Sequence, residues 1–287
     1  MIGCGRMGGA MAGTLGRAGF DLIVWNRSPG RADAVASSTG AEVAASPAEA
    51  AAKADAVITS LADDEAVRAV YLDEDGVVAG LDGDLVVADT STIDPRTSSL
   101  VGDAVDAAGG AFIDAPVSGS VSTVEAGALT VMVGGEPETA ERMAPVLDAL
   151  AGRVIHVGPR GAGSATKLAI NALVHGLNIA LSEALVLAEK AGVERTTAYE
   201  VFASGATGAP FVQYKRRAYE HPDDTPVAFS LDLVAKDLEL ITGLGNRLGA
   251  RMDQAAMGLE IVRRAVAAGF GSADLSAIAV YLRGIGP

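Results

Sequence analysis

The sequence predicts an α/β protein in two parts: a doubly wound N-terminal domain and an all-α C-terminal domain, joined by one long helix. Up to about residue 160, short β-branched strands alternate with capped helices, a pattern typical of a parallel sheet covered by helices. A run without proline follows over 161–191 and is long enough for a helix of roughly 40 Å. Strand patterns then stop. We therefore predict domains at 1–160 and 161–287.

Composition narrows the classes of function. The 287 residues are 49% hydrophobic and 20% charged, which is enough for two packed cores. The net charge of −14 disfavours nucleic acid and anionic membrane surfaces as partners. A single cysteine, Cys4, excludes an internal disulfide and a multi-cysteine metal site, so we expect a cytoplasmic protein. The three histidines do not cluster, and we expect no metal.

A glycine-rich turn opens the chain. Gly3-Cys4-Gly5-Arg6-Met7-Gly8 is a G-x-G-x-x-G, and a helix-compatible run to Ala18 and a strand at 21–25 follow it. In a dinucleotide site the first glycine makes the turn, the second admits the pyrophosphate and the third packs helix on strand. The order predicts a Rossmann-like domain that binds NAD or NADP through Gly3, Gly5, Arg6, Met7 and Gly8. Only two residues precede Gly3, so we expect an unusually short first strand.

The end of the second strand bears on the choice of cofactor. Enzymes that use NAD place an acid there, whereas this chain has Asn26 and Arg27, with Arg31 four residues on. Such side chains can bind a 2′-phosphate, so we expect NADP, with NAD possible. The alternative is that both arginines are ordinary surface charges. Leu61 and Thr92 follow two later strands and fall on the cofactor side, unless they only pack the strand ends.

Other elements follow from hydrophobic periodicity and from capping residues. Strands are expected at 56–61, 85–89, 111–114, 130–133 and 154–157. Helices are expected at 47–54, 65–72, 95–108, 137–150, 196–203, 211–219, 231–248, 253–268 and 272–282.

The long helix carries a candidate for proton transfer. Lys167 and Asn171 are four residues apart, so their side chains share one face near the helix start. The positive end of a helix and partial burial both favour the neutral amine, which a proton acceptor requires. The alternative is a solvated lysine in a first turn. The same helix contains Asn171, His175 and Asn178, so we do not expect it to span a membrane.

Five stretches in order resemble the β-hydroxyacid dehydrogenase family over nearly the whole chain. Asp114 to Ser120 opens from a strand end into small residues whose N–H groups can bind an anion. The stretches are IGCGRMGGAMAGTLGRAGF, DAPVSGS, TVEAGALTVMVGG, GAGSATKLAIN and VAKDL. The resemblance implies that Lys167 is the catalytic lysine and that Asn171 helps to hold the substrate.

It also implies that Ser118 and Gly119 grip the substrate carboxylate, and that Lys236 reaches over substrate and nicotinamide. Thr92 matches a nicotinamide-side contact. Ser120 departs from the family, which commonly has a second glycine there. A side chain at this position narrows the space beside the carboxylate, so Ser120 is a candidate for substrate selection. Ser60-Leu61-Ala62 also departs from the usual Met-Leu-Pro-like turn.

We therefore expect an NADP-preferring enzyme that interconverts a small β-hydroxyacid, such as 3-hydroxyisobutyrate, and its semialdehyde, with Lys167 as general acid and base. The alternative is a reductase of short aldehyde acids such as glyoxylate, succinic semialdehyde or tartronate semialdehyde. An imine reductase, whose members commonly lack the lysine, and a non-catalytic cofactor-binding module rank lower.

We also expect a homodimer or homotetramer, because the last helices are apolar on more than one face. The alternative is that these faces pack on one another. The residues concerned are Leu259, Ile261, Val262 and Val266 beside Leu275, Ile278 and Tyr281.

Overall fold

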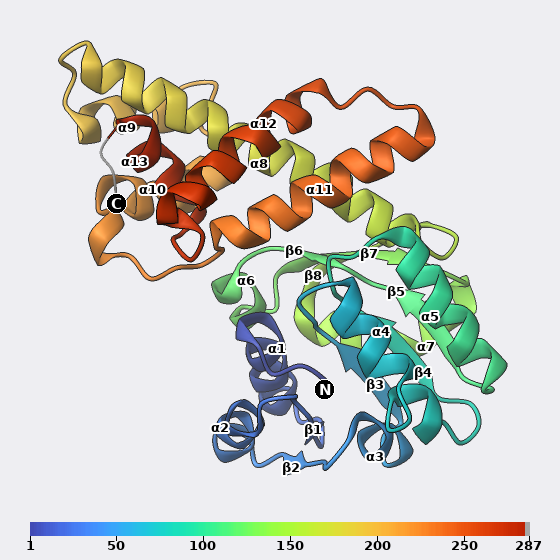
Figure 1. Cartoon of the computed structure of the whole chain (residues 1–287). Helices are drawn as coiled ribbons and strands as arrows, with labels where there is room; N and C mark the ends of the chain where they lie inside the picture. The colour runs from blue at the N-terminus through green and yellow to red at the C-terminus, as the bar shows by residue number, and fades with distance from the viewer. Residues whose placement is uncertain (285–287) are drawn as a thin grey trace. The chain divides into compact units, whose positions relative to one another are not determined.

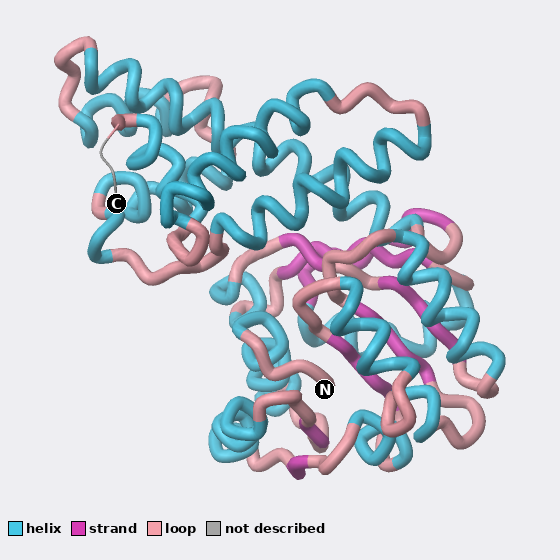
Figure 2. Tube along the Cα trace, viewed as in Figure 1, coloured by secondary structure: helices cyan, strands magenta, loops and turns pink. Residues whose placement is uncertain are grey.

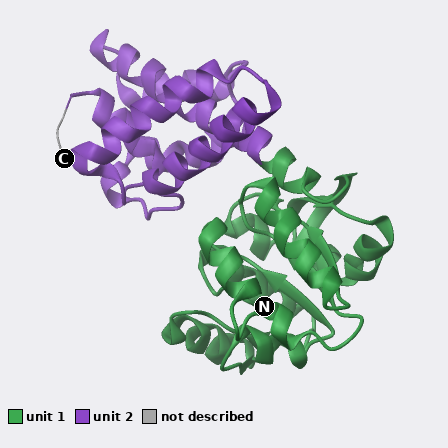
Figure 3. Ribbon diagram, turned by 45° about the vertical axis from the view of Figure 1, so that its right-hand side comes forward, with its two compact units in different colours: residues 1–167 green, residues 168–287 purple. Residues whose placement is uncertain are grey.

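The computed structural model describes residues 1–284. It contains two compact units (Figure 3): a sheet unit, Met1–Lys167, and a helical unit from Leu168 onward. The boundary falls seven residues later than the one predicted from the sequence. The long helix α8 (Ala162–Lys190) starts in the sheet unit, so its first turn belongs with the strands.

The sheet unit contains a six-stranded sheet (Figure 1). Strands β3 (Ala56–Thr59), β4 (Val86–Asp89) and β5 (Ala111–Asp114) are parallel. The remaining strands are β6 (Val117–Ser118), β7 (Leu129–Gly134) and β8 (Ala151–Gly158). Strand β7 is antiparallel to β5 and to β6, and parallel to β8. Strands β1 (Ile23–Val24) and β2 (Glu42–Val43) form a separate parallel pair. The expected short first strand is a single residue, Ile2, which bridges Trp25 and Thr59.

Helices cover both faces of this sheet (Figure 2). Val57 and Phe112 pack with α4 (Asp64–Leu72) and α5 (Pro95–Ala107). Their chain neighbours Ile58 and Ile113 pack with α1 (Arg6–Arg17) and α7 (Pro137–Leu150). Because successive strand residues point to opposite faces, this division confirms the predicted doubly wound sheet. The shorter helices are α2 (Pro29–Thr39), α3 (Pro47–Ala52), α6 (Val121–Glu125) and the 3₁₀ turn η1 (Val77–Gly80).

Helices make up the second unit, as the sequence predicts. They are the rest of α8, α9 (Arg195–Ser204), α10 (Pro210–Glu220), α11 (Leu231–Leu248), α12 (Asp253–Ala265) and α13 (Ile278–Leu282). Short turns η2 (Pro222–Asp224), η3 (Val266–Phe270) and η4 (Leu275–Ala277) connect some of them. Over the predicted helix 253–268, α12 ends at Ala265 and the chain continues as the π-helical turn η3, in which Gly269 takes φ +95°. The predicted start at 272 was wrong: Asp274 caps η4, and α13 begins only at Ile278.

The apolar faces that suggested an oligomer lie inside this unit. Leu259, Val262, Leu275 and Ile278 are buried in one core, and Ile261, Val266 and Tyr281 pack against it. These faces pack on one another, so that argument for assembly was wrong. Exposed apolar side chains occur instead on α8, where Leu173 is 76% and Leu187 72% exposed.

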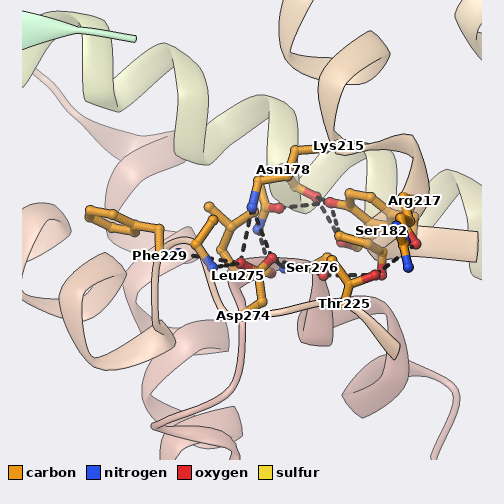
Figure 4. A network of polar contacts seen from close by, with 12 residues as sticks. Asn178, Ser182, Lys215, Arg217, Thr225, Phe229, Asp274, Leu275 and Ser276 are labelled. Atoms are coloured by element: carbon orange, nitrogen blue, oxygen red, sulfur yellow. Dashed lines mark hydrogen bonds and ion pairs between the residues drawn. The ribbon is translucent and has the colours of Figure 1, made fainter. Parts of the chain in front are cut away.

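Helix α8 is long and apolar enough, by length and composition alone, to cross a membrane, which is weak evidence. Its polar residues Asn178 and Ser182 are buried and bonded within the helical unit (Figure 4). The Asn178 amide donates to the carbonyl of Leu275 at 3.0 Å and accepts from the hydroxyl of Tyr219 at 2.7 Å. Satisfied polar groups of this kind are typical of a helix packed inside a helical domain.

Candidate active site

The glycine turn has the geometry that a dinucleotide needs. Gly3 has φ +94°, and a Cβ there would collide with the carbonyl of Ser60. A Cβ at Gly8 would collide with the carbonyl of Gly3, so helix and turn touch through backbone. Gly5 has nothing within 4 Å of its missing Cβ. It is the N-cap of α1 and makes no side-chain cap, so the first N–H groups of α1 can bind an anion.

The residues after β1 divide between two tasks. Asn26 fastens the glycine turn: its Oδ1 accepts from the amide of Cys4 at 2.9 Å, and its Nδ2 donates to the carbonyl of Ser28 at 3.0 Å. Arg27 and Arg31 are exposed and form no ion pair within residues 1–284. No acid stands in this stretch, so both guanidinium groups can meet a phosphate. Arg6, the first residue of α1, is also exposed.

Leu61 and Thr92 follow β3 and β4 at the carboxyl edge of the sheet, where ligands of doubly wound folds bind. The amide of Leu61 donates to Oγ of Ser91 at 2.9 Å. That hydroxyl donates to Oδ1 of Asp89 at 2.7 Å, and Thr59 donates to the same oxygen at 2.6 Å. Asp89 therefore joins the two strand-end loops, a role that the sequence did not reveal.

The loop 118–120 differs from the expected run of anion-binding amides. Ser118 lies in β6, paired with β7, and Gly119 has φ +146°. Ser120 is the N-cap of α6, which the sequence did not predict. Its amide donates to Oγ1 of Thr123 at 3.2 Å, and its hydroxyl accepts from the amide of Thr123. The Ser120 amide is therefore engaged within the protein, and the Ser118 amide faces Thr130 in the β6–β7 ladder. The hydroxyl of Ser118 and the amide of Gly119 remain as the candidate carboxylate donors.

Lys167 lies half-buried on the second turn of α8. The start of this helix is bonded to Asp114, the last residue of β5. The Asp114 carboxylate accepts from the amides of Gly161 at 2.8 Å and Ser164 at 2.7 Å. The helix that carries Lys167 therefore begins at the same edge of the sheet as the two strand-end loops. Asp114 heads the DAPVSGS stretch, yet its role was not predicted.

Asn171 and Lys236 meet on one buried carboxylate of the helical unit. Nδ2 of Asn171 donates to Oδ2 of Asp237 at 2.7 Å, and Nζ of Lys236 lies 2.9 Å from its Oδ1. Nε2 of His175 lies 3.3 Å from Oδ2. Asp237 is fully buried, and sequence reasoning missed both it and His175. The available signal was an acid next to a candidate lysine on an otherwise apolar helix face.

Burial alone would raise the pKa of Asp237. The hydrogen bond from His175 and the charge of Lys236 outweigh burial and hold that pKa below its usual value. The ionised carboxylate orients the Asn171 amide and the Lys236 amine, two donors suited to a small polar anion. Among residues 1–284, no group of three His, Cys, Asp or Glu side chains is placed to hold a metal ion.

Family models match both parts of the chain. The NAD binding domain of 6-phosphogluconate dehydrogenase matches residues 1–158. The NAD-binding domain of NADP-dependent 3-hydroxyisobutyrate dehydrogenase matches residues 161–282. The two matches together cover nearly the whole sequence in order.

Individual relatives align over the whole chain. Glyoxylate/succinic semialdehyde reductase 1 of Arabidopsis thaliana is 34% identical over 277 residues, 96% of this chain and 95% of the relative. 3-Sulfolactaldehyde reductase of Escherichia coli strain K12 is 35% identical over 285 residues, 98% and 94% of the two chains. A structure of Mycobacterium tuberculosis 3-hydroxyisobutyrate dehydrogenase with L-serine matches with TM-score 0.86 at 33% identity, covering 98% and 97%. With its glycine turn and two-unit fold, this chain belongs to the β-hydroxyacid dehydrogenase family of NAD(P)-dependent oxidoreductases that act on CH–OH groups.

Proposed function

We propose that this enzyme interconverts a small β-hydroxyacid and its semialdehyde, uses NADP, and transfers the hydroxyl proton through Lys167. The observation that carries the proposal is the fastening of the start of α8 to the carboxyl edge of the sheet. This sets a lysine beside the edge where the cofactor of a doubly wound fold binds. NADP supplies the hydride acceptor and donor through its nicotinamide.

The protein's own groups have separate roles in this proposal. Gly5 and the first amides of α1 hold the pyrophosphate, and Ser118 and Gly119 bind the substrate carboxylate. The neutral amine of Lys167 takes the alcohol proton during oxidation and returns it during reduction. Asn171 helps to hold the hydroxyl.

Lys167→Ala is the first test. We expect kcat for semialdehyde reduction, followed at 340 nm, to fall about 100- to 10,000-fold, because general acid–base catalysis contributes that much. The Kd for NADPH stays within about threefold. Lys190→Ala, at the other end of α8, is the matched control and keeps full turnover. Most of the turnover surviving in Lys167→Ala would contradict the proposed mechanism.

The second candidate is reduction of short aldehyde acids such as glyoxylate or succinic semialdehyde. It is favoured by the relative from Arabidopsis thaliana, whose name gives those two substrates. A panel of three- to five-carbon semialdehydes and glyoxylate, compared by kcat/KM, separates the two candidates. A larger kcat/KM for glyoxylate than for every β-semialdehyde would favour the second.

Preference for NADP is supported by the exposed Arg27 and Arg31 and by the lack of an acid at this position. We expect Arg27→Ala combined with Arg31→Ala to weaken NADPH binding about tenfold or more while NADH binding changes less than twofold. Arg251→Ala is the control, since this exposed arginine lies in the α11–α12 loop. Equal loss for both cofactors would refute a role in binding the 2′-phosphate.

We also propose a cytoplasmic homo-oligomer, with Leu173 and Leu187 on the exposed face of α8 at its interface. Light scattering of the wild type and of Leu173→Lys measures the assembly. A monomeric wild type, or a variant of unchanged mass, would contradict the assignment of this interface.

A further inference from the structure

One buried carboxylate fastens the start of α8 to the sheet. Asp114 is fully buried at the end of β5, and its two oxygens accept from different amides of the helix start, Oδ1 from Gly161 and Oδ2 from Ser164. Helix starts leave backbone N–H groups unpaired, and the preceding residue usually caps them with its side chain. Gly161 has no side chain, so Asp114 takes over this role from 47 residues away.

Glycines at the contact allow the first turn of α8 and strand β7 to approach the carboxylate closely. A Cβ at Gly163 would lie 2.6 Å from the carbonyl oxygen of Met132 and 2.9 Å from Oδ2 of Asp114. A Cβ at Gly134, on β7, would collide with Oδ1 of Asp114. The first turn of α8 therefore rests directly on the backbone of β5 and β7. This contact fixes the position of the first turn of α8 on the strands of the sheet unit.

We propose that Asp114 is a positioning residue, which sets the first turn of α8 and thereby the location of the Lys167 amine at the carboxyl edge of the sheet. The inference rests on the proposed role of Lys167 in proton transfer. Lys167 follows Ser164 by three residues, less than one helical turn, so a shift of the helix start moves its side chain too. Misplacement by about 1 Å costs up to about 100-fold in rate.

The carboxylate also brings charge to the helix start. Burial raises the pKa of Asp114, while the amides of Ser164 and Gly161 act in the opposite direction. The titratable group beside it on the sheet is Asp89, its register partner on β4. Removing the negative charge of Asp114 favours the neutral form of the Lys167 amine, which lies on the second turn of α8.

Asp114→Asn keeps the shape but loses the charge and one of the two acceptor oxygens. With NADPH and the best semialdehyde of the panel, we expect kcat to fall about 10- to 100-fold. We expect the pH profile of kcat to shift to lower pH, whereas KM and the Kd for NADPH change less than about threefold. By hydrogen exchange, the amides of Gly161 and Ser164 become at least tenfold less protected. Asp114→Ser is measured as well, in case the asparagine variant does not fold.

Ser46→Ala is the matched control. Ser46 caps α3 of the same unit through the amide of Glu49 at 3.0 Å, so its loss weakens a helix start away from Lys167. We expect its kcat and pH profile to match the wild type. Unchanged kcat and pH profile in both Asp114 variants would overturn the positioning role, even where Lys167→Ala is inactive. Turnover retained in Lys167→Ala would instead reject the proposed function.

Discussion

The two units bury the same side chain in opposite surroundings. In the sheet unit, Asp89 and Asp114 accept hydrogen bonds from neutral hydroxyl and backbone N–H groups. In the helical unit, Asp237 and Asp274 each face a neighbouring lysine. All four carboxylates are at least nine-tenths buried. The difference between the two regions is therefore the charge of the partners and not the depth of burial.

The consequence is visible in how readily each acid ionises. Burial raises the pKa of Asp89 to about 6, against the hydrogen bonds from Thr59 and Ser91, and the charge of Asp114 adds to the increase. Burial would also raise the pKa of Asp274, but the charge and hydrogen bonds of Lys215 outweigh it and lower the pKa. At Asp89 the neutral donors do not offset the desolvation of the carboxylate, whereas at Asp274 the lysine does.

The buried acids of the two units also differ in what they do in the structure. Nζ of Lys215 donates to Oδ1 of Asp274 at 3.0 Å (Figure 4). The Asp274 carboxylate also accepts from the amides of Ala228, Phe229 and Ser276, so it holds the segment before α11 in place. The sheet unit leaves its ionised acids less stabilised, and both lie at the carboxyl ends of their strands, the edge at which doubly wound folds bind ligands.

Breaking the ion pair should have the largest effect on stability. In Lys215→Met, Asp274 remains buried without its cation, so we expect the free energy of unfolding to fall by about 3–5 kcal/mol. Urea unfolding of the helical unit, followed by hydrogen exchange, measures this. Arg142→Ala removes an exposed pair with Asp84 and should cost less than about 1 kcal/mol. Equal losses in the two variants would remove the contrast between buried and exposed pairs.

The next effect depends on pH. A folded-state pKa of Asp89 raised to about 6 means that the folded protein holds this proton more tightly than the unfolded chain. The contribution of protonated Asp89 to the free energy of unfolding is complete below about pH 4 and is lost as pH rises through 6. The change is roughly 3 kcal/mol. We expect Asp89→Asn to remove this dependence, measured as the difference in Tm from wild type at pH 4 and pH 7. A difference independent of pH would show that Asp89 does not titrate in this range.

The smallest expected effect is a difference between the two units in how much hydrogen-exchange protection they lose in acid. The lowered pKa values of Asp237 and Asp274 mean that their stabilisation is present above about pH 4 and is lost as pH falls below it. The raised pKa of Asp114 acts in the opposite direction. Between pH 5 and pH 3, we expect amides of α11 to lose several-fold more protection than those of β4. Greater loss in β4 would reverse the comparison.

Local pattern was enough to predict most of the fold. Strand β5 and helices α7 and α11 end at the predicted residues, because alternation, proline at the first helical position and a glycine at Gly249 all mark them in the sequence. Strand β6 and helix α6 were missed. A two-residue strand has too little pattern to detect, and only its pairing with β7 defines it.

By itself, the sequence determined the glycine turn, the lysine on α8 and the family, since each depends on residues close together in the chain. Only the tertiary structure decided which buried acids hold the strand-end loops, the start of α8 and Asn171 in place. Asp89 meets Thr59 across 30 residues, Asp114 meets α8 across about 50, and Asp237 meets Asn171 across 66. The physical reason is that a buried carboxylate is defined by the partners that folding brings to it, and no local period or spacing records them.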